Sequence, residues 1–267
     1  MSKIEKALYE LNSIEQASQL RSPLHALDSR VKLIVTFLYL ICMLSLPLKD
    51  LSRLILFCLY PIITCAMAGI GYGTIFKRSL IVLPFVFFIG IFNPILDRQV
   101  VFSVGNVNIT AGWISFISIL LRGVLSAQAV FLLIYSTGFY NVCRGMQHLG
   151  IPALLTTQLL FVYRYIFVLL QEALNMHRAR VSRSFGRKSY PFKMWGIFIG
   201  QLLIRTVERS QRIHRAMLSR GFSGSIKSNF HPQWRVNETF YLTVWGILFI
   251  GLRVFHSISI LNVSFHP

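Results

Sequence analysis

The chain carries the stretch QEALNMHRARVSRSFG at residues 171–186 and a similar stretch, VERSQRIHRAMLSRGF, at residues 207–222. Each begins near a Glu, carries a His in its middle and ends in Ser-Arg followed by a small residue. Gly186 and Gly221 stand where a helix commonly closes in the left-handed conformation. Pro191 lies between the two stretches, where a helix breaks. We therefore predict two amphipathic helices with matching ends.

These two helices lie in the most basic part of the chain. From residue 171 to residue 235 there are thirteen Lys and Arg, and only Glu172 and Glu208 oppose them. The whole chain has 27 Lys and Arg against 9 Asp and Glu, a formal charge of +18. Such a charge is typical either of nucleic-acid binding or of a membrane protein with positive cytoplasmic loops.

Composition decides between these two classes. Hydrophobic residues make up 54% of the chain, charged residues 13%, and the mean hydropathy is +0.60. Soluble domains carry about 25% charged residues. The chain therefore has too little polar side chain to cover a water-facing surface, and we predict a membrane protein.

Five apolar runs are long enough to cross about 30 Å of hydrocarbon. They comprise residues 31–48, 51–71, 79–95, 111–135 and 239–255. Residues 153–170 are also apolar but continue without a break into the first basic helix, so they are not counted. The prediction is an all-α membrane protein with about five transmembrane helices and two long cytoplasmic amphipathic helices.

The predicted organisation has three parts. Residues 1–135 hold the N-terminal tail and four spans, residues 136–235 hold the basic helices, and residues 236–267 hold the last span and a tail. Lys and Arg in short loops place the N-terminus and the basic helices in the cytoplasm and the C-terminus outside. The polar first thirty residues contain no apolar core of a signal peptide, so the first span is expected to act as the targeting signal.

A small outside β-hairpin is predicted between two spans. The stretch QVVFSVGNVNIT at residues 99–110 is rich in β-branched residues and has Gly105-Asn106 at its centre. An irregular loop is the alternative.

Three interpretations of the basic helices compete. Their arginines could contact anionic lipid headgroups. A nucleic-acid patch would require interleaved aromatic side chains or a recognisable module, and neither is present. A docking surface for a soluble partner is favoured by the repeated Ser-Arg ends, because lipid contact requires charge but no particular end sequence.

Further motifs follow one another in an order typical of a known family. They are SPLHALDSRVKLI at 22–34, the stretch from Gly112 through Arg122 to Ser136-Thr137, LGIP at 149–152 and FVYRYIFVLLQEALNMHRAR at 161–180. Together they resemble the CbiQ/EcfT-type transmembrane subunit of energy-coupling-factor ABC transporters. RYIFVLLQEA is particularly similar to the cobalt-type branch, and the resemblance covers most of the chain.

The resemblance implies where the functional residues lie. The family carries an Ala-Arg-Gly-like signature at the end of each of two coupling helices, and its arginine is expected to enter a groove of an ATPase. The corresponding residues here are Ser182, Arg183, Ser184, Ser219, Arg220 and Gly221. Both signatures keep the arginine, whereas the flanking residues depart from the family pattern, most clearly in the first, which leaves open a specialised ATPase partner.

The resemblance also implies the partners. It predicts two ABC ATPase subunits and a substrate-binding membrane subunit that is cobalt-specific and CbiM-like, accompanied by a small accessory membrane subunit. Membrane lipids are expected to surround the chain, and no nucleic acid is expected. ATP would be bound by the partner subunits and no cofactor by this chain, which has no Walker A motif or Gly-rich phosphate loop. The chain is then a non-catalytic coupling subunit in the plasma (inner) membrane. Cobalt is the expected substrate, and nickel or a vitamin stays open.

Supporting residues are expected at two places. Asp28, Arg30 and Lys32 precede the first span, where they either brace the coupling helices or enforce the positive-inside orientation. Glu172 and Arg180 lie on the first basic helix and are expected to support coupling.

Arg122 lies about halfway along the fourth apolar run. Contact with a partner or with the coupling helices is one interpretation of this position. We favour the other, an arginine that extends to the membrane edge, because the run is longer than a span and can slide.

No metal site is predicted on this chain. No two of its seven histidines stand three or four residues apart, and its four cysteines form no CxxC or Cys/His cluster. A membrane-anchored protein whose basic helices hold anionic lipid or nucleic acid remains the alternative function. An intramembrane enzyme would require a convergent set of His, Asp, Glu or Ser, which the sequence lacks.

Overall fold

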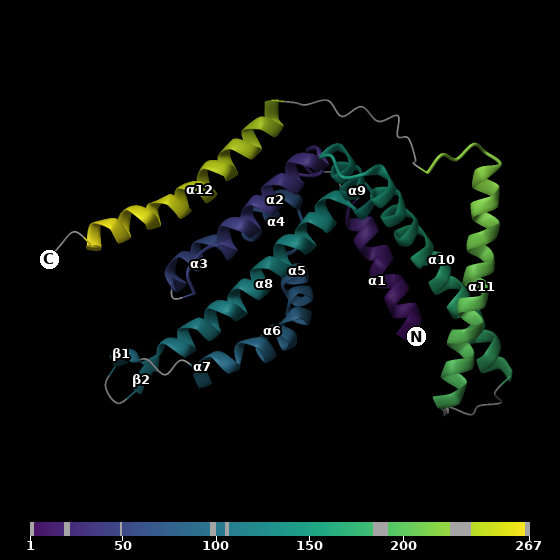
Figure 1. The fold of residues 1–267 in the computed structure, drawn as a ribbon, viewed down its shortest axis with the longest axis horizontal. Coiled ribbons are helices and arrows are strands. Elements are labelled where there is room, and N and C mark those ends of the chain that lie inside the picture. Colours follow the sequence, from purple (N-terminus) through teal and green to yellow (C-terminus); the bar gives the residue numbers. More distant parts are fainter. Residues whose placement is uncertain are drawn as a thin grey trace. The chain divides into compact units, whose positions relative to one another are not determined.

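The computed structural model describes residues 3–18, 22–48, 50–96, 100–104, 107–183, 192–224 and 236–264. In chain order the elements are α1 (Lys3–Ser18), α2 (Ser29–Leu44), α3 (Leu51–Phe57), α4 (Leu59–Ala68), α5 (Tyr72–Ser79), the 3₁₀ turn η1 (Leu80–Val82), α6 (Leu83–Gly90), α7 (Phe92–Leu96), β1 (Val100–Val104), β2 (Val107–Thr110), α8 (Ala111–Thr137), α9 (Phe139–His148), α10 (Ala153–Arg183), α11 (Phe192–Leu218) and α12 (Val236–Ser264) (Figure 1).

The chain divides into two compact units. The basic unit comprises residues 1–14 and 146–231, and the core unit comprises residues 15–145 and 232–267. In this division α9 begins within the core unit, and α12 belongs to the same unit as α2. Gly145 lets α9 come close to α2: a Cβ there would stand 2.7 Å from Leu33 and 2.9 Å from Ser29, so a larger residue would require these side chains to shift.

Four helical stretches of the described chain are long and apolar enough to cross a membrane, by length and composition alone. They are Leu51–Ala68, Tyr72–Pro94, Ala111–Thr137 and Ala153–Arg183. The first three overlap the predicted second, third and fourth spans. The fourth is the apolar run that was not counted, which qualifies because α10 is continuous over 31 residues. The first and last predicted spans form α2 and α12, which are not among these four, so the all-α membrane class holds while the number of spans differs.

Aromatic rings fill the centre of the core unit. Tyr39 of α2 stacks on Tyr60 of α4 with ring centroids 4.4 Å apart, and its hydroxyl donates to the Phe57 carbonyl at 3.1 Å. Trp245 and Phe249 of α12 pack against the same cluster. Burial of such rings is the main favourable contribution in a packed core, so this cluster attaches α12 to the first helices of the unit.

Two basic side chains connect α2 with α8. Lys32, 4% exposed in the first turn of α2, donates to the Ser136 carbonyl at 3.1 Å near the end of α8. Arg122 of α8, 8% exposed, donates to the Leu44 carbonyl at 3.5 Å and to the Pro47 carbonyl at 2.8 Å. Leu44 is the last residue of α2, and Pro47 follows the helix in the sequence. The two helices are therefore antiparallel, and α2 is bonded to α8 near both of its own ends (Figure 1).

The expectation for Arg122 was wrong. Its guanidinium is buried rather than extended to a membrane edge, and it bonds carbonyl groups at the C-terminal end of another helix. The Leu44 carbonyl lies in the last turn of α2, where carbonyls lack an intrahelical partner and carry the negative end of the helix dipole. A buried arginine is stable there because the helix end supplies acceptors.

The N-terminus of α2 is fixed by two carboxylates. Asp28 is its N-cap, and its side chain accepts from the Arg30 N–H at 3.0 Å, as N-cap aspartates commonly do. The Asp28 N–H in turn donates to Glu238 Oε1 of α12 at 3.3 Å, and Glu238 is 3% exposed. The start of α12 is thereby joined to the start of α2.

The predicted hairpin is confirmed. Strands β1 and β2 are antiparallel, with Val104 opposite Val107 next to the turn and Val100 opposite Thr110 at the far end. The two turn residues, Gly105 and Asn106, lie outside the described part of the chain.

Candidate coupling site

The first predicted coupling helix is the long second half of α10. The first half of α10 is apolar and exposes large side chains, among them Leu154, which is 57% exposed, and Val162, which is 59% exposed. The basic half ends at Arg183, which is exposed. Ser182 Oγ donates to the Arg178 carbonyl at 3.1 Å, so the serine of the first signature bonds its own helix. Ser184 lies outside the described residues, as do Gly186 and Pro191.

The second predicted coupling helix is α11, and its C-terminal end has the backbone conformation expected from the sequence. Gly221 has φ +79°, the left-handed conformation expected there. Its N–H donates to the Leu218 carbonyl at 3.0 Å, and the Phe222 N–H donates to the Met217 carbonyl at 3.0 Å. This pair of bonds is a Schellman motif and makes Arg220 the C-cap residue. The backbone of Arg220 is thus fixed while its side chain is exposed.

The serine of the second signature behaves like that of the first. Ser219 Oγ donates to the Ala216 carbonyl at 3.0 Å within the same helix. In both signatures, the serine therefore satisfies a local carbonyl and the arginine side chain extends into solvent.

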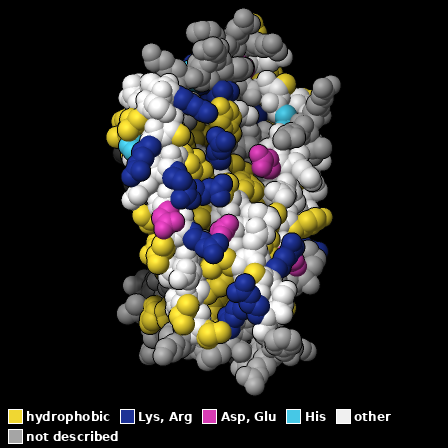
Figure 2. All heavy atoms as spheres, turned by 90° about the vertical axis from the view of Figure 1, so that its right-hand side faces the viewer, with side chains coloured by type: hydrophobic (Ala, Val, Ile, Leu, Met, Phe, Trp, Pro, Cys, Tyr) yellow, Lys and Arg dark blue, Asp and Glu magenta, His cyan; other side chains and the backbone are white. Residues whose placement is uncertain are grey.

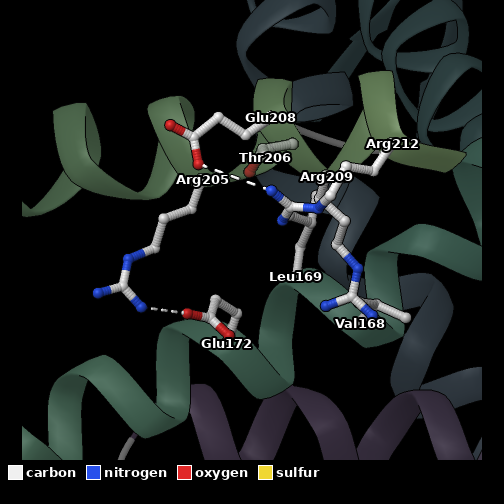
Figure 3. A pocket seen from close by; sticks show the side chains of 8 residues that line it. All are labelled: Val168, Leu169, Glu172, Arg205, Thr206, Glu208, Arg209 and Arg212. Carbon is white, nitrogen blue, oxygen red and sulfur yellow. Dashed lines mark hydrogen bonds and ion pairs between the residues drawn. The ribbon is translucent and has the colours of Figure 1, made fainter.

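An ion pair joins the two helices. Arg205 Nη1 of α11 donates to Glu172 Oε1 of α10 at 2.6 Å, and Figure 3 shows both side chains extending between the helices. Glu172 was predicted as a supporting residue, but its partner was not. The sequence gives no means of choosing Arg205 among thirteen basic residues, because the two positions are 33 residues apart.

Three hollows follow the line between α10 and α11. One, of about 300 Å³, is lined by the charged groups drawn in Figure 3, including Glu172 and Arg209. A second, of about 560 Å³, is lined by Arg180 and Arg183 together with apolar side chains of α11. The third, of about 400 Å³, is mostly apolar and includes Phe161 and Phe222. The predicted supporting residues Glu172 and Arg180 therefore lie between the helices.

Charged and apolar side chains alternate along this region. On the face seen in Figure 2, Lys and Arg side chains form a line with hydrophobic side chains beside and between them. Exposed apolar side chains of α11 include Ile197, which is 56% exposed, and Leu203, which is 62% exposed. Contiguous exposed apolar side chains indicate a surface that lipid or another protein covers.

The other predicted supporting residues lie in the core unit. Asp28 caps α2, Arg30 donates its N–H to that cap, and Lys32 bonds the end of α8. The structure thus gives all three a place around the N-terminus of α2 within the core unit. Among the residues the structure describes, no three His, Cys, Asp or Glu gather in a group that could hold a metal ion.

Comparison with known proteins agrees with these features. The sequence model of the CbiQ family, described as "cobalt transport protein", matches residues 20–232. An uncharacterized protein of Methanocaldococcus jannaschii, MJ1571, is 28% identical over 97% of this chain and 92% of its own length. A second uncharacterized protein of that organism, MJ1089, is 30% identical over 38% of each chain. The cobalt transport protein CbiQ of Salmonella typhimurium is 31% identical over 34% of this chain and 41% of its own.

Helices that can span a membrane, together with a transport-family match over most of the chain, define a class: a membrane-embedded component of a transporter rather than a catalytic enzyme. The chain belongs to the CbiQ family of cobalt transport proteins. Members of this family work within a transporter complex.

Proposed function

We propose that the chain is the coupling subunit of an energy-coupling-factor importer for cobalt, passing movement of partner ATPases to a substrate-binding membrane subunit. The observation that carries this proposal is the pair α10–α11. Two long helices are joined by Glu172–Arg205, and each ends in an exposed arginine that follows a serine. A membrane protein that only held lipid would require the charge but not two similar helix ends.

The helix ends suit an ATPase partner. A guanidinium is always charged, and its planar fork can bond carboxylates or backbone carbonyls in a fixed orientation. The Schellman motif fixes the Arg220 backbone, so a force on this side chain acts directly on α11. ATP would be bound and hydrolysed by two partner subunits, and their closure would move the ends of α10 and α11 together.

The apolar surfaces suit a membrane partner. The first half of α10 and the apolar side chains of α11 are exposed, and the apolar hollow of about 400 Å³ lies between these helices. A substrate-binding membrane subunit, with a small accessory membrane subunit, would cover this surface. The Salmonella relative's name supports cobalt as the substrate. In this assembly the basic unit and the N-terminus face the cytoplasm, and the C-terminus lies outside.

The test is a double substitution, Arg183→Ala with Arg220→Ala, in the full chain co-expressed with its ATPase and substrate subunits. We expect loss of cobalt uptake and of ATPase copurification, with membrane insertion intact. The matched control is Arg209→Ala with Arg212→Ala, which removes the same charge from α11 away from its end. It should retain copurification. Full uptake by the Arg183/Arg220 variant would exclude the proposal.

The alternative is a membrane-anchored protein whose basic helices hold anionic lipid or nucleic acid. Arg183→Lys with Arg220→Lys separates the two functions, because it keeps the charge and loses the planar fork. Attraction to phosphate groups should survive this change, whereas groove docking should not. Equal losses in the two Arg→Ala pairs would also favour the alternative, because the number of charges alone would then matter.

A further inference from the structure

The helix α1 precedes the part of the chain that the CbiQ family model describes. That match begins at residue 20, whereas α1 comprises Lys3–Ser18. The alignment with MJ1571 covers 97% of the chain, which leaves too few residues unaligned to omit α1 entirely. Residues 1–14 group with the basic unit in space, although the core unit follows them directly in the sequence. The location of α1 therefore needs an explanation of its own.

One contact connects α1 with the first coupling helix. Arg178 Nη2 of α10 donates to Glu5 Oε1 of α1 at 3.0 Å. The Glu5 side chain is 29% exposed and the Arg178 side chain 62%. Arg178 lies in the basic half of α10, shortly before the signature residue Arg183. The contact therefore lies close to the end that the proposed function assigns to the ATPase.

The α1 contact and the α11 contact lie on opposite sides of α10. Leu174 and Arg178 are four residues apart and share one face of the helix. Leu174 is 4% exposed, although it lies in a half that is otherwise largely accessible. At 100° per residue, the opposite face carries most of the residues that line the hollow toward α11. Of the residues that line this hollow, Glu172, Met176, Ala179, Arg180 and Arg183 lie on that opposite side, whereas Asn175 is three residues from Arg178 and lies beside its face.

The described side chains of α1 agree with a helix sheltered on one side. Leu8 and Leu11, three residues apart, are partly buried. Tyr9 and Asn12, also three apart, lie on another face and are exposed, Tyr9 at 69%. A helix with this distribution packs one face against a neighbour.

We propose that residues 3–14 of α1 brace the face of α10 that points away from α11, with Glu5 and Arg178 as its positioning residues. The basic half of α10 is then held from two sides, by α11 through Glu172–Arg205 and by α1 through Glu5–Arg178. The consequence for transport rests on the proposed function: the brace keeps the Arg183 end in register with the Arg220 end. The brace itself does not depend on an ATPase.

The first test is amide hydrogen exchange on the purified full-length chain. Glu5→Lys places two cations together, and we expect residues 174–183 to exchange roughly fivefold faster, a change typical of losing one partly exposed ion pair. The matched control is Glu208→Lys, which breaks the exposed pair between Glu208 and Arg212 on α11 at 3.9 Å. It should leave exchange of residues 174–183 unchanged. Wild-type exchange in Glu5→Lys would overturn the brace.

The charge swap Glu5→Arg with Arg178→Glu restores the attraction and should restore slow exchange in residues 174–183. The second test measures cobalt transported per ATP hydrolysed in the assembled complex. Glu5→Lys should lower this ratio several-fold, and the charge swap should recover it. A protein that was merely less stable would lower the rate of cobalt transport and the rate of ATP hydrolysis together, so the ratio would not change. An unchanged ratio, or no recovery by the swap, overturns the positioning role. If no ATPase assembles with the wild type, the proposed function fails while hydrogen exchange still decides the brace.

Discussion

In the core unit, Arg122 is 8% exposed and donates to main-chain carbonyls at the end of α2, whereas in the basic unit Arg220 is exposed at the end of its own helix. Both arginines therefore stand at the C-terminal end of a helix, where a cation is favoured. The first is used within the fold, and the second extends its side chain outward. The same residue type thus serves structure in one unit and is available to a partner in the other.

The environment explains this difference. An apolar core offers no water to a guanidinium, so a buried one persists only where the fold supplies acceptors. Lys32 and Glu238 follow the same rule, since each is buried and each bonds a main-chain group of a neighbouring helix. On α10 and α11 water solvates the arginines, so their positions are not restricted by a need for internal acceptors. Substitutions in the two units should therefore differ in kind.

The largest effect on stability is expected for Arg122→Met. Its two bonded carbonyls, of Leu44 and Pro47, would lose a charged donor within the core, which costs about 2–3 kcal/mol. Thermal unfolding of the purified full-length protein in detergent would measure it. The matched control Arg212→Met replaces an exposed arginine and should change stability by less than about 0.5 kcal/mol. Equal effects of the two would show that the contrast between the units is not one of burial.

A smaller loss, about 1 kcal/mol, is expected for Lys32→Met. Only one carbonyl, that of Ser136, loses a donor here, whereas Arg122→Met removes a donor from two, and methionine fills a volume similar to that of lysine. The same thermal measurement distinguishes the two substitutions. A loss as large as that of Arg122→Met would mean that Lys32 carries more than its single described bond to Ser136.

Features set by neighbouring residues were predictable from the sequence. The end of α11 at Gly221, the hairpin around residues 105–106 and the long basic helices all depend on local backbone preferences and periodicity. The class of membrane protein followed from composition, which is a property of the whole chain.

Features set by distant residues were not predictable. Arg122 was misplaced because its acceptors lie 75 and 78 residues away, at a helix end that only the fold brings near. Glu172 was recognised, but Arg205 was one cation among many. The approach of α9 to α2 at Gly145 also depends on residues far apart in the sequence, because a Cβ there would meet side chains of α2.

The smallest effect, a dependence of stability on pH, is expected from His25 of the core unit. Its Nε2–H donates to the Ala17 carbonyl at 3.2 Å and its Nδ1 accepts from the Ser22 hydroxyl at 2.6 Å, so the neutral ring is bonded on both sides. Burial, and then the nearby charge of Lys32, lower the pKa of His25 below its usual 6.5. Folding therefore favours the neutral ring. Its contribution is complete above about pH 6.5, the value in the unfolded chain, and declines as the pH falls below it.

The difference between wild type and His25→Gln isolates this contribution from other titrating groups. Between pH 7.5 and pH 5.5, wild type should lose more thermal stability than His25→Gln does. A His25→Gln curve parallel to that of wild type would show that the ring titrates alike in the folded and unfolded chain. The contrast between a core that restricts its polar groups and a basic unit that leaves them in water would then not extend to this histidine.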